Sequence, residues 1–388
     1  MKKILALVLA LALLTSMAAC ASKTQDTQTP AQDTAPAADT ADTNDTAQST
    51  EDTAQKTYTL NVSGIDAGLG LFPAYVAKEF GWFQEAGLDV NFIGFTNGPV
   101  QMEAIDSWDL GLTGVGGVLS GTISYDAILL GTVGTDYGTT RIFVRPDSPV
   151  ALAGTGSNAN NADIYGDAES WKQMSINCTY GNILHYMLLR TLSGFGLTLE
   201  DVNVNWMDQP TCNAAFLAGE GDATCTTGPN SLVADKAEFV VASSGEMAQT
   251  GVLTNIMANP ASYANEETRE AMKIFLTVFF RAAEWVTENP QEATSHMVDW
   301  CIYSGNTIDE EIAYQYLILD KYYTLEDNYN SLHEPASDGG DYCQVQEQIL
   351  NVLKFFIETE NYQPGDDEIF LRPEHFDSTL IDELYAAR

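Results

Sequence analysis

Short apolar strands and short helices alternate twice along this chain, and this alternation is the strongest constraint on its fold. The first set has strand-like runs at 58–63, 88–95 and 110–113, separated by helical runs at 73–80 and 99–105. The second set has strand-like runs at 174–178, 202–207 and 223–226, separated by helical runs at 183–192 and 212–217. A β-α-β-α-β order is typical of a mostly parallel sheet with helices on both faces. The sequence therefore predicts an α/β protein with two lobes.

The length of the folded part also favours two lobes, because it exceeds the usual size of a single hydrophobic core. An extended run at 141–149 can cross from one lobe to the other, and a second at 238–241 can return. The acidic, helical segments that follow are expected to cover the first lobe. The predicted first lobe comprises residues 57–140 and 240–388, and the predicted second lobe comprises residues 141–239.

The first twenty residues are typical of an exported bacterial lipoprotein. Lys2 and Lys3 precede an apolar run at 4–14 that is too short to span a bilayer, and small alanines precede Cys20. We expect a lipoprotein signal peptide at 1–20, lipidation of Cys20, and anchoring at the extracytoplasmic face of the cell membrane. The alternative is an ordinary signal peptide with a chance cysteine near its cleavage site.

Residues 21–56 contain no aromatic and no large aliphatic side chain. Such a segment cannot bury a core, so we expect a disordered acidic tether between the anchor and the folded part. A cleaved pro-segment is the alternative interpretation.

The charge of the chain excludes one class of partner. With 54 acidic and 17 basic residues, the formal net charge is −37. Nucleic acid binding needs Lys and Arg to replace phosphate counterions, so this balance argues against it. It also disfavours adsorption to anionic lipid headgroups, which leaves the acyl anchor as the expected membrane contact.

Five cysteines follow Cys20, and their pairing stays open from the sequence. An odd number leaves at least one thiol unpaired within the chain. A disulfide between Cys212 and Cys225 is one possibility, and five small buried thiols are the other. The five are Cys178, Cys212, Cys225, Cys301 and Cys343.

The turns between strands and helices are the candidate ligand-binding elements. In each, a few small polar residues separate the end of a strand from the start of a helix, which places backbone N–H groups at the carboxyl edge of the sheet. Ligands bind at that edge in open α/β sheets. Turns of this kind on two facing lobes favour a cleft that closes on a small solute. They lie at 70–73, 95–99, 112–117, 178–182 and 225–230.

Several segments resemble the nitrate/sulfonate/taurine-type solute-binding proteins of ABC importers, which share a fold with thiamine-precursor proteins. The similarity covers about residues 58–384. The segments are 81–90 (GWFQEAGLDV), 108–114 (WDLGLTG), 147–149 (DSP), 219–223 (GEGDA) and 282–290 (AAEWVTENP).

The resemblance implies a type II periplasmic-binding-protein-like fold, with a ligand cleft between two lobes that each hold a mostly parallel sheet flanked by helices. It implies a protein that delivers a small solute, such as a sulfonate, taurine or nitrate, to an ABC permease and its ATPase. A monomer is the default expectation. Carried over by position, the ligand contacts fall on Thr96, Asn97, Gly98, Thr113, Gly114, Val115, Thr179, Tyr180, Gly181, Thr226 and Thr227.

The charge of the solute stays open from the sequence. Helix N-termini favour an anion, but the turns contain no Lys or Arg, and Asp66 and Asp136 lie close to them in sequence. A zwitterion, a neutral heterocycle or an amine is therefore as well supported as a sulfonate.

No motif predicts an enzyme. The sequence contains no H-E-x-x-H or G-x-S-x-G string, and its four histidines are far apart. We expect no catalytic residue, no cofactor and no metal site. Two alternatives to transport are a surface sensor and, less well supported, a pyrimidine-precursor synthase, which needs a lysine and a histidine in its cleft.

Overall fold

The computed structural model describes residues 56–388 except 67, 136 and 252. The predicted signal peptide, the predicted lipidation of Cys20 and nearly all of the predicted tether lie outside the described residues.

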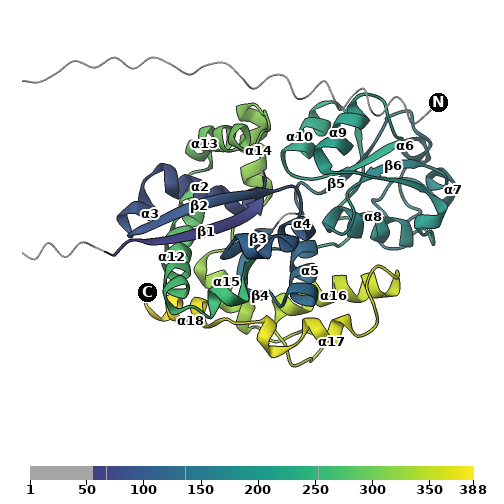
Figure 1. Ribbon diagram of the computed structural model, residues 1–388. Coiled ribbons are helices and arrows are strands. Elements are labelled where there is room, and N and C mark those ends of the chain that lie inside the picture. Colours follow the sequence, from purple (N-terminus) through teal and green to yellow (C-terminus); the bar gives the residue numbers. More distant parts are fainter. Residues whose placement is uncertain (1–55, 67, 136, 252) are drawn as a thin grey trace, which may run out of the picture. The chain divides into compact units, whose positions relative to one another are not determined.

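The first lobe is built on a five-stranded sheet in the order β2-β1-β3-β10-β4 (Figure 1). Strand β1 pairs in parallel with β2 and β3, whereas β10 is antiparallel to both β3 and β4. Four strands therefore run in one direction and β10 runs against them. The strands are β1 (Tyr58–Ile65), β2 (Leu88–Phe95), β3 (Leu110–Thr113), β4 (Ile128–Thr135) and β10 (Leu253–Ala258).

The second lobe repeats this plan with the order β7-β6-β8-β5-β9. Here β6 pairs in parallel with β7 and β8, and β5 is the reversed strand between β8 and β9. The predicted pair of mostly parallel sheets flanked by helices is confirmed, with one reversed strand in each. The strands are β5 (Arg141–Val144), β6 (Ser175–Cys178), β7 (Asn203–Trp206), β8 (Ala223–Thr226) and β9 (Val240–Ser244).

The chain passes between the sheets after β4 and again after β9. Strand β9 pairs with β5 and therefore belongs to the second sheet, although its residues fall in the range predicted for the first lobe. The lobe ranges otherwise stay a prediction. The return crossing thus lies between Ser244 and Leu253, after the expected position 240.

Helices cover both faces of each sheet. Up to β9 they are α2 (Phe72–Glu79), α3 (Trp82–Glu85), α4 (Gly98–Glu103), α5 (Val115–Tyr125), α6 (Pro149–Ala153), α7 (Ala168–Trp171), α8 (Ile183–Ser193), α9 (Gln209–Leu217) and α10 (Gly228–Lys236). After β10 they are α11 (Pro260–Tyr263), α12 (Glu266–Glu288), α13 (Pro290–Tyr303), α14 (Glu310–Leu319), α15 (Leu325–His333), α16 (Gln344–Glu358), α17 (Asp366–Phe370) and α18 (Thr379–Ala386). Single 3-10 turns lie at Leu69–Leu71, Ile105–Ser107, Leu199–Asp201 and Pro373–His375.

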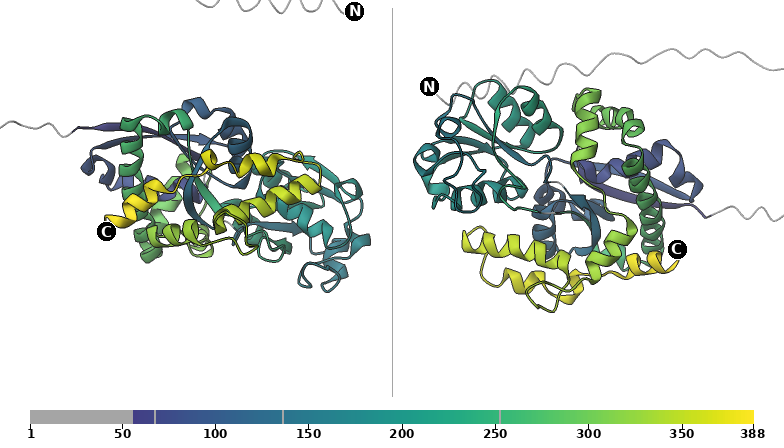
Figure 2. Two further views of the ribbon diagram at one scale, coloured as in Figure 1. Left: turned by 90° about the horizontal axis from the view of Figure 1, so that it is seen from below. Right: turned by 180° about the vertical axis from the view of Figure 1, so that it is seen from behind.

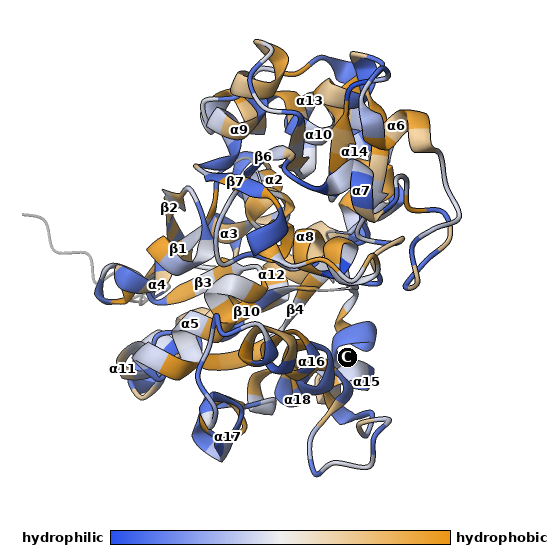
Figure 3. Ribbon diagram, turned by 90° about the vertical axis from the view of Figure 1, so that its right-hand side faces the viewer, coloured by the Kyte–Doolittle hydropathy of each residue, from blue (hydrophilic) through white to orange (hydrophobic). Residues whose placement is uncertain are grey.

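The long helix α12 packs an apolar stripe against the first sheet. Met272, Phe275 and Phe279 are fully buried along this stripe, as their spacing of three to four residues predicts. The ring of Phe275 stacks on Phe83 with centroids 5.4 Å apart. Figure 3 shows the apolar strands β3 and β10 near the middle of this lobe, enclosed by helices.

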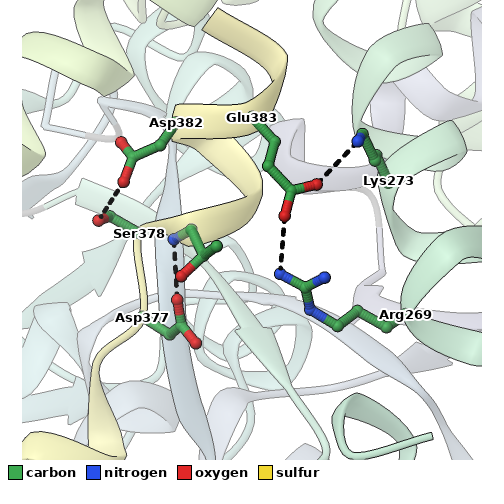
Figure 4. A network of polar contacts seen from close by, with 7 residues as sticks. Arg269, Lys273, Asp377, Ser378, Asp382 and Glu383 are labelled. Carbon is green, nitrogen blue, oxygen red and sulfur yellow. Dashed lines mark hydrogen bonds and ion pairs between the residues drawn. The ribbon is translucent and has the colours of Figure 1, made fainter. Parts of the chain in front are cut away.

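A polar network fastens the last helix to α12 (Figure 4). The carboxylate of Glu383 in α18 accepts from Lys273 at 2.7 Å and from Arg269 at 3.3 Å, both in α12. The two cations, Lys273 first, hold the pKa of Glu383 below its ordinary value. This cluster is partly exposed, so its contribution to stability is modest.

The C-terminal helices also reach the second lobe, beyond the first lobe that they were predicted to cover (Figure 2). In α16, Phe355 and Phe356 contact the ring of Tyr186 in α8. Near the start of α14, Asp309 and Glu311 bind Lys236 of α10 at 2.7 and 2.8 Å. Of the helices within the described residues, none is both long and apolar enough to span a membrane.

Candidate functional site

A cavity lies between the lobes at the carboxyl ends of the central strands. We call it the main cavity; its volume is about 360 Å³. The first lobe contributes the turns after β1, β2 and β3, and the second lobe contributes the starts of α8, α9 and α10. Turns from both lobes therefore face one space, as the sequence predicted.

The predicted site residues fall into three groups. Thr96, Asn97, Gly98, Gly114, Val115 and Thr227 line the main cavity. Thr179, Tyr180 and Gly181, with Asn97 again, line a second cavity beside it. Thr113 and Thr226 are absent from the described lining of both cavities, because each is the last residue of its strand and is fully buried. Ligand contact by any of these residues stays a prediction.

Side chains already cap three of the helix starts around the main cavity. Asn97 accepts from the Val100 N–H at 3.1 Å, at the start of α4. Asn182 accepts from Leu184 at 3.0 Å in α8, and Asp208 accepts from Thr211 at 3.0 Å in α9. These contacts satisfy N–H groups that would otherwise be free for a ligand. Within the described chain, α5 begins after Gly114 without a side-chain cap.

The lobes touch each other next to the main cavity. A Cβ atom on Gly116 in α5 would overlap the backbone carbonyl oxygen of Gly181, so only glycine permits this approach. At the crossing segment, the Thr227 hydroxyl lies 2.9 Å from that of Thr140. The Gly228 N–H donates to the Thr139 hydroxyl at 3.0 Å. The cavity is therefore bounded by direct contacts between the lobes.

Two carboxylates line the main cavity. Asp320 is 3% exposed and accepts from the Gly138 N–H at 2.8 Å and from the Thr139 hydroxyl at 2.9 Å. Burial raises the pKa of Asp320 to about 6 despite these hydrogen bonds. Partial burial also raises the pKa of Asp66, at the end of β1. Both groups lose hydration of their charged form, which is the physical cause of the rise.

The second cavity, which we call the aromatic cavity, has a volume of about 430 Å³. It lies between the second lobe and the segment from α16 to Tyr362. The ring of His185 lies 5.0 Å from Tyr180, 4.9 Å from Trp206 and 5.4 Å from Phe356, measured between centroids. Its lining comprises Asn97, Pro99, Ser120, Thr179, Tyr180, Gly181, His185, Trp206, Met207, Asp208, Phe356, Asn361 and Tyr362.

His185 presents a hydrogen-bond donor to the aromatic cavity. Its Nδ1 accepts from the Gly181 N–H at 3.3 Å, and burial lowers its pKa to about 4. At pH 7 the ring is therefore neutral and carries its proton on Nε2. Among the described residues, His185 Nε2 has no hydrogen-bond partner, although it is buried.

The site also includes residues that the sequence analysis did not assign to it. Asp320 and Tyr316 reach the main cavity from the α14 region, and His185, Phe356 and Tyr362 reach the aromatic cavity. Asp320, Tyr316, Phe356 and Tyr362 do not follow a β-α turn, so the turn pattern gave no signal for them. His185 lies in the first turn of α8, directly after the predicted turn at 178–182, but the sequence analysis did not extend into that helix.

The structure also bears on the cysteines and on metal binding. All five described cysteines are buried free thiols, so the alternative disulfide between Cys212 and Cys225 is not present. Burial raises the pKa of Cys212 to about 12. No group of three His, Cys, Asp or Glu side chains within the described residues is arranged to hold a metal ion.

Two α/β lobes, each with one reversed strand, joined by two crossings and enclosing a cavity at their strand ends, define the two-lobed fold of the periplasmic binding proteins. The family model described as NMT1-like matches residues 64–302. The chain therefore belongs to the NMT1-like family.

Similar proteins agree with this assignment. A protein of Brachyspira hyodysenteriae, named as an ABC transporter periplasmic binding protein, is 22% identical over 284 residues, which is 71% of this chain and 81% of that protein. The periplasmic aliphatic sulphonate binding protein SsuA of Escherichia coli has a TM-score of 0.60 at 17% identity, over 82% of this chain and 92% of its own. The periplasmic nitrate-binding protein NrtA of Synechocystis PCC 6803 has a TM-score of 0.63 at 14% identity, over 85% of this chain and 89% of its own. The predicted resemblance to this group is thus confirmed for family and fold.

Proposed function

We propose that this protein is the extracytoplasmic solute-binding component of an ABC importer, which captures a small solute between its lobes and delivers it to a permease and its ATPase. The main cavity carries the proposal, because turns from both lobes line one space of a size suited to a small molecule. Membership of the NMT1-like family and similarity to a named ABC transporter binding protein support it.

The finer parts of the proposal follow from the sequence. Anchoring through lipidated Cys20, a tether over residues 21–56 and a monomeric state are consistent with capture next to a membrane permease. The proposed contacts are the turn residues that line the two cavities, with the uncapped start of α5 as a backbone donor site. We propose binding and release of the solute without chemical conversion.

Ligand-dependent stabilisation of the purified chain tests the proposal. A solute at a hundredfold excess over its dissociation constant stabilises the folded state by about 2.7 kcal/mol. We expect one class among sulfonates, nitrate, bicarbonate, amines and pyrimidines to raise the melting temperature with saturation. No stabilisation by any class would contradict solute binding.

An uptake measurement then separates transport from sensing. We expect cells that lack this protein to lose uptake of the solute that stabilises it, and the full chain to restore uptake. Unchanged uptake with proven binding would favour a surface sensor, and release of a converted product would favour an enzyme.

A further inference from the structure

Neither cavity between the lobes offers a positively charged side chain. Two carboxylates, Asp66 and Asp320, line the main cavity, and its lining within the described chain includes no Lys, Arg or His. The aromatic cavity adds Asp208 and His185, whose ring is neutral at pH 7. An anion bound here would lose its water and meet carboxylates without a compensating cation, which is unfavourable.

The two carboxylates differ in whether they already accept hydrogen bonds from the protein. Asp320 holds the crossing segment through Gly138 and Thr139. Arg141 attracts Asp320 electrostatically, but its guanidinium is bound to Asp235 at 2.8 Å and is not part of the described cavity lining. Asp66 has no side-chain partner among the described residues, and its carboxylate occupies space that a side chain at Gly94 would fill. Asp66 is therefore free to bind a cation.

Helix N-termini are the main argument for an anion, and side chains already accept from some of their N–H groups. Asn97, Asn182 and Asp208 cap α4, α8 and α9. The first N–H of α10 donates to Thr139. The uncapped start of α5 can hold one acceptor group of a solute, but it does not offset two carboxylates.

The aromatic cavity supplies an independent sign of a ligand. His185 is 0% exposed and lines this cavity, and its Nε2 has no hydrogen-bond partner within the described structure. The rings of Trp206, Tyr180 and Phe356 surround the imidazole. The two cavities lie side by side and share Asn97 in their linings.

We propose that the solute carries a positively charged nitrogen, which Asp66 and Asp320 hold in the main cavity, and an acceptor group for the N–H of His185. This inference rests on the proposed solute-binding function. It assigns amines and zwitterions, rather than simple sulfonates or nitrate, as the solute class of this site.

Matched probes test the charge requirement by calorimetry and thermal unfolding of the full chain. Each set contains a primary or quaternary amine, an aminosulfonate and the sulfonate without the amine; ethylamine, taurine and ethanesulfonate form the smallest set. Choline-like and aromatic skeletons form the others, and nitrate is added. We expect binding only by probes that carry the charged nitrogen, and a dissociation constant raised at least about tenfold in Asp66→Asn.

Variants show which carboxylates contact the solute. They also distinguish a failure of this inference from a failure of the proposed solute binding. Asp320→Asn should also weaken binding of the cationic probes, whereas Asp106→Asn, which changes an exposed carboxylate outside the cavities, should not. Binding of a sulfonate or nitrate at least as tight as that of its amine counterpart would overturn this inference and leave solute binding intact. Amine binding that neither Asp variant weakens would overturn the assignment of Asp66 and Asp320. No binding by any of these probes would overturn this inference, and solute binding itself would be overturned only if bicarbonate and pyrimidines also failed to stabilise the chain.

Discussion

His185 shows how one buried side chain can join ligand recognition to stability. The ring is enclosed by Tyr180, Trp206 and Phe356, and burial lowers its pKa to about 4. In the unfolded chain the same group titrates near 6.5. The unfolded state therefore takes up a proton on this residue first as the pH falls. The stabilising contribution is complete above pH 6.5 and is lost toward about pH 4.

This linkage predicts a difference between two proteins. Relative to His185→Phe, which keeps a ring but cannot titrate, the wild type should lose about 3 kcal/mol of unfolding free energy between pH 7 and about pH 4. The pKa of Asp320 is raised, so folding favours its protonated form, and its contribution to stability changes with pH in the opposite direction. Because Asp320 is present in both proteins, its contribution cancels in the difference between their unfolding free energies. Denaturant unfolding at a series of pH values measures the difference, and parallel curves would refute the neutral, buried state of His185.

At the scale of elements, the outer edge of β4 is covered by segments that follow it by about two hundred residues. Asn328 of α15 accepts from the Thr132 N–H and donates to the Thr132 carbonyl oxygen, both at 2.7 Å. The Thr135 N–H donates to Lys321 O at 2.9 Å, and Asp377 N–H donates to Leu129 O at 3.0 Å. These contacts protect an edge strand that would otherwise expose unpaired backbone groups.

Asn328→Ala should therefore destabilise the protein by about 2 kcal/mol or more, since it leaves two buried backbone groups of Thr132 unsatisfied. Asn330→Ala in the same helix changes an exposed side chain and should stay within about 0.5 kcal/mol of the wild type. Chemical denaturation of the three proteins gives the comparison. Equal stability of the two variants would mean that water replaces the Asn328 amide.

The elements also show what the sequence could predict. Strands β2, β3 and β8 end where the apolar runs end, because local composition marks their boundaries. The sequence analysis did not predict β10, since its place between β3 and β4 depends on partners more than a hundred residues away. The same limit applies to the site. Turn chemistry predicted the lining at 96–98 and 179–181, but Asp320 and Phe356 arrive through tertiary packing.

At the scale of the whole molecule, function depends on how closely the lobes can approach. Gly116 and Gly181 meet beside the main cavity, where a Cβ atom on Gly116 would overlap the Gly181 carbonyl oxygen. Both partners are backbone, so neither can move aside as a flexible side chain would. Contacts of α14 with α10 and of α16 with α8 lie on other parts of the same boundary.

Gly116→Ala should therefore keep the lobes apart while the helix itself stays intact. Alanine favours helix over glycine by about 1 kcal/mol, so weaker binding could not be attributed to loss of α5. We expect a larger radius of gyration by small-angle X-ray scattering and affinity lowered at least about tenfold for any probe that stabilises the wild type. Gly251→Ala, where no atom lies within 4 Å of the added methyl group, should match the wild type in both measurements. Wild-type affinity in Gly116→Ala would mean that the solute binds without closing this contact, which would place recognition on one lobe alone.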